Sequence, residues 1–176
     1  MDTVLRYESH PDRCLRLWLF TDVENAKEVR EKLLKAEIAP EFAFLNASLI
    51  PDIFVVHLAS CKALWSDCAG SRRTKSLHAE LVVNVAASKH ISNSLTRFGI
   101  SDDTKHLMVA RFDGTAEDAT LLKSLIKGKQ VSMDALASLS DSQGLKKYHK
   151  IQPEELQIGS QVDAICCRVA SHELER

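Results

Sequence analysis

The residues best suited to chemistry in this chain are a histidine and a cysteine one helical turn apart. His57 and Cys61 have a spacing that can place two ligands on one metal ion. The same pair could act as base and nucleophile. Both lie in a nearly all-apolar segment, and a closed zinc site needs four ligands. We therefore expect buried side chains here and predict no metal site and no catalytic residue.

Other catalytic signatures are missing from the sequence. Gly128 and Lys129 resemble the end of a phosphate-binding loop, but that loop needs glycine at 123 and serine or threonine at 130. Lys123 and Gln130 occupy these positions. No GxSxG elbow, HExxH helix or set of kinase loops occurs. The sequence favours a binding protein over an enzyme and predicts no cofactor.

A basic segment is the strongest candidate for a binding site. Arg72, Arg73 and Lys75 place three cations within four residues. Such a patch binds phosphates by charge and counterion release, although a charge run is usually an ordinary solvated loop. The formal net charge is -1, so any RNA contact must be local. Ile91 could offer an apolar surface to a base, or it could be part of the core.

Around these residues the sequence predicts a mixture of helices and strands. Apolar runs predict strands at residues 14–20, 77–87 and 107–112. Helical spacing predicts helices at 23–34, 51–68, 91–98, 116–126, 134–139 and 143–148, and a last helix after Ser160. No βαβ rhythm links these elements. We expect the α+β class, with a small antiparallel or mixed sheet packed with several helices in a single domain over residues 1–176.

Three details of these elements are specific predictions. Thr21 and Glu24 form a capping-box pair that begins the first helix. The helix at 51–68 ends near Gly70 and is apolar around most of its circumference, so we expect it to be the central buried helix. Ile158 and Val169 fall on the apolar face of the last helix.

Composition and cysteine usage indicate the cellular compartment. The first 14 residues carry acids and no apolar stretch, so we expect no signal peptide. No apolar run approaches the ~18 residues that would span a membrane. The five cysteines are odd in number and form no CxxC pair, which indicates free thiols. We expect a protein of the cytoplasm and nucleus that contacts no membrane.

The chain as a whole resembles a known family. Four blocks occur in a fixed order: LRLWLFTDVENAKEVREKL, RTKSLHAELVVNVAASKHISNSLTRFGIS, KGKQVSMDAL and IGSQVDAICCRV. They resemble the TPRKB family, which are the PRPK-binding proteins of the KEOPS complex, also called EKC. The resemblance covers nearly the whole chain.

The resemblance implies a non-catalytic subunit of a tRNA-modifying complex. That complex transfers a threonylcarbamoyl group to the adenosine next to the anticodon. A separate subunit performs the transfer, and a kinase-like subunit of the PRPK type hydrolyses ATP. Members of the family bind and support the kinase-like subunit, and they bind the CCA end of tRNA. The alternative is a regulator of the kinase-like subunit that contacts no RNA, since fold does not fix function.

The family's tRNA-end site includes a lysine and an isoleucine. The resemblance assigns these roles to Lys75, which would hold a phosphate, and to Ile91, which would pack against a base. Arg72, Arg73 and Ser92 are neighbours that we add to the site.

The kinase contact has no clear motif in the sequence. From the pattern of apolar surfaces we expect it on the first helix near Val29 and Leu33, and on the last helix near Val162 and Val169.

Overall fold

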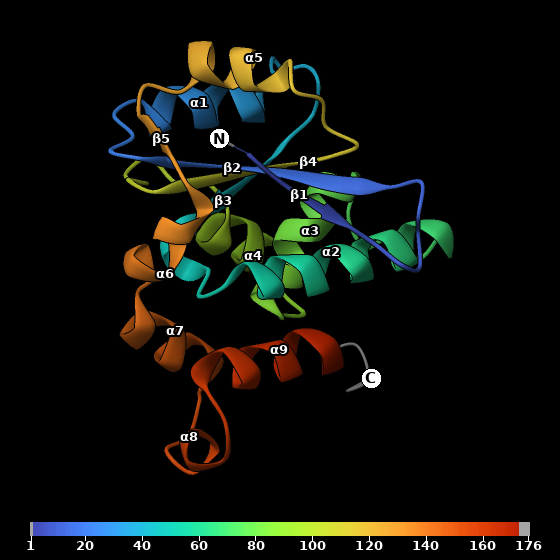
Figure 1. Ribbon diagram of the computed structural model, residues 1–176, viewed down its shortest axis with the longest axis vertical. Helices are drawn as coiled ribbons and strands as arrows, with labels where there is room; N and C mark the ends of the chain where they lie inside the picture. Colours follow the sequence, from blue (N-terminus) through green and yellow to red (C-terminus); the bar gives the residue numbers. More distant parts are fainter. Residues whose placement is uncertain (1, 173–176) are drawn as a thin grey trace.

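An antiparallel sheet forms the centre of the structure, a computed structural model that describes residues 2–172 (Figure 1). The strand order is β1-β2-β4-β3. These strands are β1 (Thr3–Arg6), β2 (Cys14–Thr21), β4 (Leu107–Phe112) and β3 (Ala43–Asn46). A short strand, β5 (Lys129–Val131), pairs with residues 19–21 of β2, on the edge that β1 occupies beside residues 14–17.

Alternate side chains of β2 enter two different cores. Leu15, Leu17 and Leu19 belong to the larger core, while Trp18 and Phe20 belong to the smaller one. Successive side chains of a strand point to opposite faces of the sheet. The nearly continuous apolar run of this strand therefore reflects a sheet that is buried on both faces.

Helices cover both faces of the sheet, so the α+β class and the single domain are confirmed (Figure 1). The smaller core lies under α1 (Ala26–Leu34) and α5 (Asp118–Leu125). The other face carries α2 (Ile53–Cys68), α3 (Leu77–Ala86), α4 (Ile91–Phe98), α6 (Leu136–Leu139), α7 (Ser142–His149), α8 (Glu155–Ile158) and α9 (Gln161–Ser171). Two 3-10 turns are η1 (Ala47–Leu49) and η2 (Met133–Ala135).

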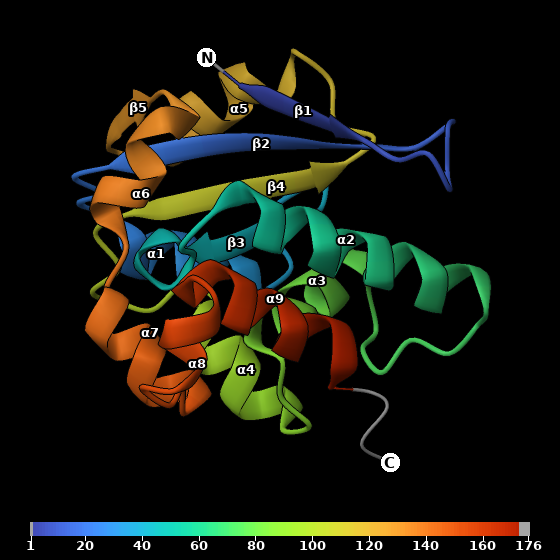
Figure 2. The same ribbon diagram turned by 60° about the horizontal axis from the view of Figure 1, so that its bottom comes forward.

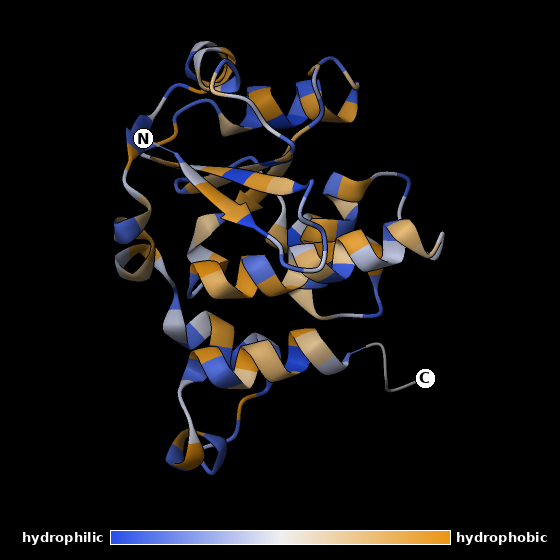
Figure 3. Cartoon of the chain, turned by 45° about the vertical axis from the view of Figure 1, so that its right-hand side comes forward, coloured by the Kyte–Doolittle hydropathy of each residue, from blue (hydrophilic) through white to orange (hydrophobic). Residues whose placement is uncertain are grey.

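The helices of the second face form two sublayers. α2 and α3 lie nearest the sheet, and α9 packs against α2 with α7 beside it (Figure 2). Hydrophobic residues run along the strands and along the helices that cover them (Figure 3). Among the helices at residues 2–172, none is long and apolar enough to cross a membrane.

Several predicted helix ends are confirmed. The Asp52 carboxylate accepts a hydrogen bond from the Phe54 amide at 2.7 Å and caps α2. Gly70 follows the end of α2 with φ +63°, a backbone conformation that favours glycine. At the start of α9, Ser160 and Asp163 form a complete capping box.

The predicted strand at residues 77–87 is wrong, because this segment is the helix α3. The Ser76 hydroxyl accepts a hydrogen bond from the Ala79 amide at 3.1 Å and starts the helix. The valines suggested a strand, but strand preference depends strongly on packing. Here α3 packs against α2, and every side chain from Glu80 to Ala86 is buried.

The predicted capping box at Thr21 and Glu24 is also wrong. Thr21 is the last residue of β2 and pairs with Lys129. The helix begins at Ala26, after Asn25, and the Asn25 side chain makes no cap hydrogen bond. Its amide instead donates to the Leu125 carbonyl at 2.9 Å, and its oxygen accepts from the Lys127 amide at 2.8 Å. Asn25 thus links the start of α1 to the end of α5 and the residues that follow it.

Three predictions of burial need correction. His57 and Cys61 are half-buried on α2, not buried as expected. The central helix is α3, while α2 leaves Phe54 56% and Trp65 63% exposed. Ile158 does not lie on the inner face of the last helix, because it ends α8 and is 92% exposed. Val169 lies in the larger core, as predicted.

Candidate functional site

The basic loop, residues 71–76, connects α2 to α3. Lys75 is exposed and makes no ion pair within residues 2–172. Arg72 is exposed as well, but its Nε lies 3.0 Å from Oδ1 of Asp67. One of its terminal nitrogens donates to the Lys75 carbonyl at 3.4 Å. Lys75 is therefore free to contact a partner, whereas Arg72 is held against Asp67 and the backbone of the loop.

Glu80 fixes the conformation of the basic loop. This residue of α3 has no exposed surface. Its Oε2 accepts hydrogen bonds from the Arg73 amide (3.1 Å), the Thr74 amide (2.9 Å) and the Thr74 hydroxyl (2.7 Å). Its other oxygen faces Arg73 Nε at 3.5 Å. Hydrogen bonds to a carboxylate are stronger than those between neutral groups. Glu80 of α3 therefore fixes the backbone conformation of the loop.

Arg73 connects the basic loop to the start of α4. Its guanidinium donates to the Asn84 side-chain oxygen at 3.1 Å and to the Ser88 carbonyl at 3.4 Å. Ser88 lies shortly before Ile91, which is half-buried, and Ser92, which is exposed. The structure thus brings the predicted RNA-binding segments together. The Arg73 guanidinium is already hydrogen-bonded within the protein by these contacts, so it is not free to bind a phosphate.

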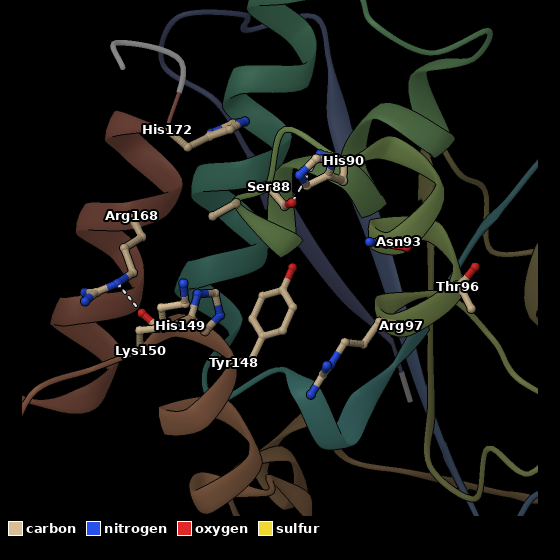
Figure 4. Close-up of a pocket in the computed structure, with 11 residues that line it drawn as sticks. Ser88, His90, Asn93, Thr96, Arg97, Tyr148, His149, Lys150, Arg168 and His172 are labelled. Carbon is tan, nitrogen blue, oxygen red and sulfur yellow. Dashed lines mark hydrogen bonds between the residues drawn. The ribbon is translucent and has the colours of Figure 1, made fainter. Parts of the chain in front are cut away.

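A cavity of about 810 Å³ opens beside these segments, between α4, α7 and α9 (Figure 4). Ser88 and His90 come from the connection between α3 and α4. Arg97 of α4 and Arg168 of α9 stand on opposite sides, with His149 between them (Figure 4). Sequence spacing could not reveal this cavity, because its walls come from three distant segments.

The charged groups of the cavity differ in their partners. Arg168 binds both oxygens of Glu155 at 2.8 Å, and this contact lowers the pKa of Glu155 to about 2. The Arg97 guanidinium lies over the Tyr148 ring at 4.8 Å and makes no ion pair within residues 2–172. Burial, together with Arg168 and Arg97, lowers the pKa of His149 to about 4. His149 is therefore neutral at pH 7.

The lowered pKa of His149 predicts a loss of stability in acid. The folded pKa lies below the ordinary value of 6.5, so the unfolded chain binds the proton more tightly. Well above pH 6.5, His149 should not make the free energy of unfolding depend on pH. By pH 5 it should lower the free energy of unfolding by about 2 kcal/mol. Urea unfolding of His149→Phe beside the wild type at pH 7.5 and pH 5 measures this contribution. An equal difference between the two proteins at both pH values would contradict it.

His57 and Cys61, the candidate base and nucleophile, are not arranged for catalysis. The His57 ring packs against Tyr7 and Phe54, with ring centroids 5.2 and 6.5 Å away. Burial raises the pKa of the Cys61 thiol, which keeps it protonated and a poor nucleophile. Within residues 2–172, no three His, Cys, Asp or Glu side chains gather closely enough to hold a metal ion.

The residues predicted for the kinase contact lie on two different sides of the molecule. α1 and α9 cover opposite faces of the sheet (Figure 1). Val29 and Val169 have no exposed surface, so neither side chain is available to a partner. Leu33 is half-buried beside a cavity of about 280 Å³, and Val162 packs partly against the larger core. The four residues do not form one surface.

A stripe of apolar residues on α2 was missed by the sequence reasoning. We define the α2 stripe as Phe54, Leu58, Cys61, Trp65 and Cys68, whose spacing alternates between four and three residues. Such spacing places side chains along one face of a helix. Phe54, Trp65 and Cys68 are exposed, and the other two are half-buried. The regular spacing could have identified the stripe from the sequence. It was missed because apolar residues also occur on the opposite side of α2.

The chain is similar over most of its length to proteins of one family. A family model described as kinase binding protein CGI-121 matches residues 20–173. The EKC/KEOPS complex subunit TPRKB of Danio rerio is 32% identical over 154 residues, which cover 86% of this chain and 87% of that protein. The subunit CGI121 of the same complex from Coccidioides immitis is 31% identical over 151 residues, with coverage of 81% and 71%. The corresponding Schizosaccharomyces pombe subunit is 26% identical over 152 residues, with coverage of 84% and 87%.

Proposed function

Because this chain belongs to the CGI-121 family of kinase-binding proteins, we propose that it is a non-catalytic subunit of an EKC/KEOPS complex. In this role it binds and supports the kinase-like ATPase subunit, and through it joins the transferase subunit. It also binds the CCA end of a tRNA whose adenosine next to the anticodon receives a threonylcarbamoyl group. The match over residues 20–173, which includes every element from α1 to α9, carries the proposal.

The α2 stripe supports a contact with the kinase-like subunit. Exposed apolar surface on a folded protein often marks a protein interface, and tryptophan is enriched among the residues that dominate binding energy. Trp65 is 63% exposed on this stripe. α9 packs against α2, and its residues Val162 and Cys166 are half-buried. We therefore place the kinase contact on α2 and the adjoining part of α9, and not on α1.

The basic loop and the start of α4 support a contact with RNA. Lys75 is exposed and free to bind a phosphate, while Ile91 has some exposed surface for a base. Ser92 and Arg72 flank them and are exposed. Because Glu80 and Arg73 already hold these segments in place, little conformational entropy should be lost on binding.

The RNA contact predicts a specific pattern in a gel-shift titration. Lys75→Glu and Ile91→Glu should each lower the affinity for tRNA roughly tenfold or more, because each removes a direct contact. Removing the CCA end from the tRNA should weaken binding to the wild type in the same way. Lys123→Glu is the matched control, since Lys123 is an exposed cation on α5 across the sheet.

Equal binding of trimmed and intact tRNA would contradict the RNA contact. If the chain then still bound the kinase-like subunit, the alternative would hold: a protein-interaction regulator that contacts no RNA.

We also propose that the protein acts in the cytoplasm and nucleus. All five cysteines are free, and Cys68 and Cys167 are exposed. Exposed free thiols are typical of reducing compartments. Fractionation of cells that express the tagged chain would test this location.

A further inference from the structure

A groove lies along the free edge of the sheet, next to β3. The strand order β1-β2-β4-β3 gives β3 a neighbouring strand on one side only (Figure 2). The cavity of about 280 Å³ beside Leu33 borders the other side. We define the β3 groove as this cavity, which lies between residues 30–34 of α1, the segment 41–44, and residues 78–82 and 95–100 of α3, α4 and the turn that follows α4.

The backbone at the floor of the β3 groove can hydrogen-bond to an added strand. The Ala47 amide donates to the His106 carbonyl at 2.9 Å, in register with the pairing of β3 and β4. Hydrogen-bonded pairs alternate along an antiparallel ladder, so Ala43 and Leu45 bond to β4 while Phe44 directs its amide and carbonyl outward. Within residues 2–172, no carbonyl of a helix or loop accepts from the Phe44 amide. Such an edge is a template for another strand.

The edge is open over a short stretch only. An isolated bridge joins Leu45 to Gly99. A Cβ atom on Gly99 would lie 3.8 Å from the Phe44 carbonyl oxygen, which places this oxygen beside the turn after α4. The open part is therefore the stretch from Phe42 to the Phe44 amide, and both phenylalanines line the groove. Because so few backbone groups are available, an added strand also needs side-chain contacts.

Apolar side chains flank the open edge on both sides. Leu34 of α1 is 70% exposed and Leu95 of α4 is 37% exposed, and both line the groove. Successive side chains of an added strand would point to opposite faces of the sheet. One would meet Leu33 and Leu34, and the next would meet Ala79 and Leu95. Apolar side chains at these two positions would remove exposed apolar surface from water.

The charge of the β3 groove favours a basic partner. The Glu41 side chain is 54% exposed, and its carboxylate faces Nδ1 of His78 at 3.7 Å. Nε2 of His78 accepts a hydrogen bond from the Phe112 amide at 3.2 Å, so this nitrogen carries no proton. Burial also lowers the pKa of His78, which is therefore neutral at pH 7. Arg30 lines the groove too, but Asp102 pairs with it at 3.0 Å. Glu41 thus leaves one negative charge uncompensated.

We propose that the β3 groove binds an extended segment of a partner protein. This segment adds a short strand to β3, packs apolar side chains against α1 and α4, and places a lysine or arginine opposite Glu41. Addition of a strand to a sheet edge gives affinity through main-chain hydrogen bonds and specificity through side-chain pockets. No residue of α2 or α9 lines the groove, so the site lies apart from the proposed kinase contact and does not depend on the proposed function.

Phage display of random short peptides on the full-length chain tests the site. Enriched peptides should share neighbouring apolar residues with a lysine or arginine close to them. Fluorescence anisotropy of an enriched peptide then compares variants. Leu34→Glu adds a charge at the rim, Ala79→Leu fills the groove, and Glu41→Lys reverses its charge. Each should weaken binding about tenfold. Trp65→Glu is the matched control, because it changes an exposed apolar residue on α2, and it should leave binding unchanged.

N-methylation of single peptide amides tests the added strand. Only every second residue of an edge strand bonds to its neighbour. Methylation at alternate positions should therefore weaken binding about tenfold, and methylation between them should not. Equal tolerance at every position would overturn the added strand.

Three further results would overturn the proposal. The first is a selection that enriches no sequence. The second is a set of enriched peptides that bind Leu34→Glu and Ala79→Leu like the wild type, while melting temperatures within a few degrees of the wild type show that both variants are folded. The third comes from sedimentation velocity: a dimer that forms with rising concentration and is lost in Leu34→Glu would make a second copy of the chain the occupant.

Discussion

Glu80→Ala is expected to lower the free energy of unfolding by about 3–5 kcal/mol, which is typical when one partner of a buried ion pair is removed. Glu80 is completely buried, and Oε2 accepts three hydrogen bonds from Arg73 and Thr74. Its removal leaves the Arg73 charge and two backbone amides without this acceptor. For a chain of this size the melting temperature should fall by roughly 10 °C. Urea and thermal unfolding measure both quantities.

Two variants control for this result. Glu31→Ala removes an exposed acid from α1 and should change stability by no more than about 0.5 kcal/mol. Glu80→Gln keeps the size and one acceptor oxygen and should cause a smaller loss than Glu80→Ala. If Glu80→Ala unfolds like Glu31→Ala, then Glu80 does not hold the basic loop as described.

Trp65→Glu is expected to weaken binding to the kinase-like subunit by roughly 30- to 1,000-fold, which corresponds to the loss of about 2–4 kcal/mol at an interface hot spot. The substitution should leave the fold intact, because the Trp65 side chain is 63% exposed. Calorimetric titration of the purified kinase-like subunit with each variant gives the affinities.

Leu34→Glu is the matched control for Trp65→Glu. Leu34 is 70% exposed on α1, on the opposite face of the sheet from α2. We expect its substitution to leave the affinity unchanged. If Leu34→Glu abolishes binding and Trp65→Glu does not, the kinase contact lies on α1, where the sequence reasoning first placed part of it.

The elements that the sequence predicted well are governed by local chemistry. The Asp52 cap and Gly70 define α2, and Ser160 with Asp163 starts α9, because each of these signals acts within one turn of its own helix. α3 was mispredicted as a strand because its valines are buried by α2 and the sheet, and tertiary packing overrode their local preference.

The candidate site was only partly predictable for a similar reason. Lys75, Arg72 and Ile91 could be selected from charge and resemblance. The contacts of Arg73 with Glu80 and Ser88 depend on how a loop folds against a helix. The cavity joins residues near 90, 149 and 168, and no spacing rule connects positions so far apart.

The most important proposal is that this chain binds the kinase-like subunit of an EKC/KEOPS complex. Affinity purification of the tagged chain from its own cells, followed by quantitative mass spectrometry, tests that claim most directly. We expect recovery of the kinase-like ATPase in an amount equal to the chain, together with the transferase subunit. Recovery of a folded chain with neither of these proteins would contradict membership in the complex.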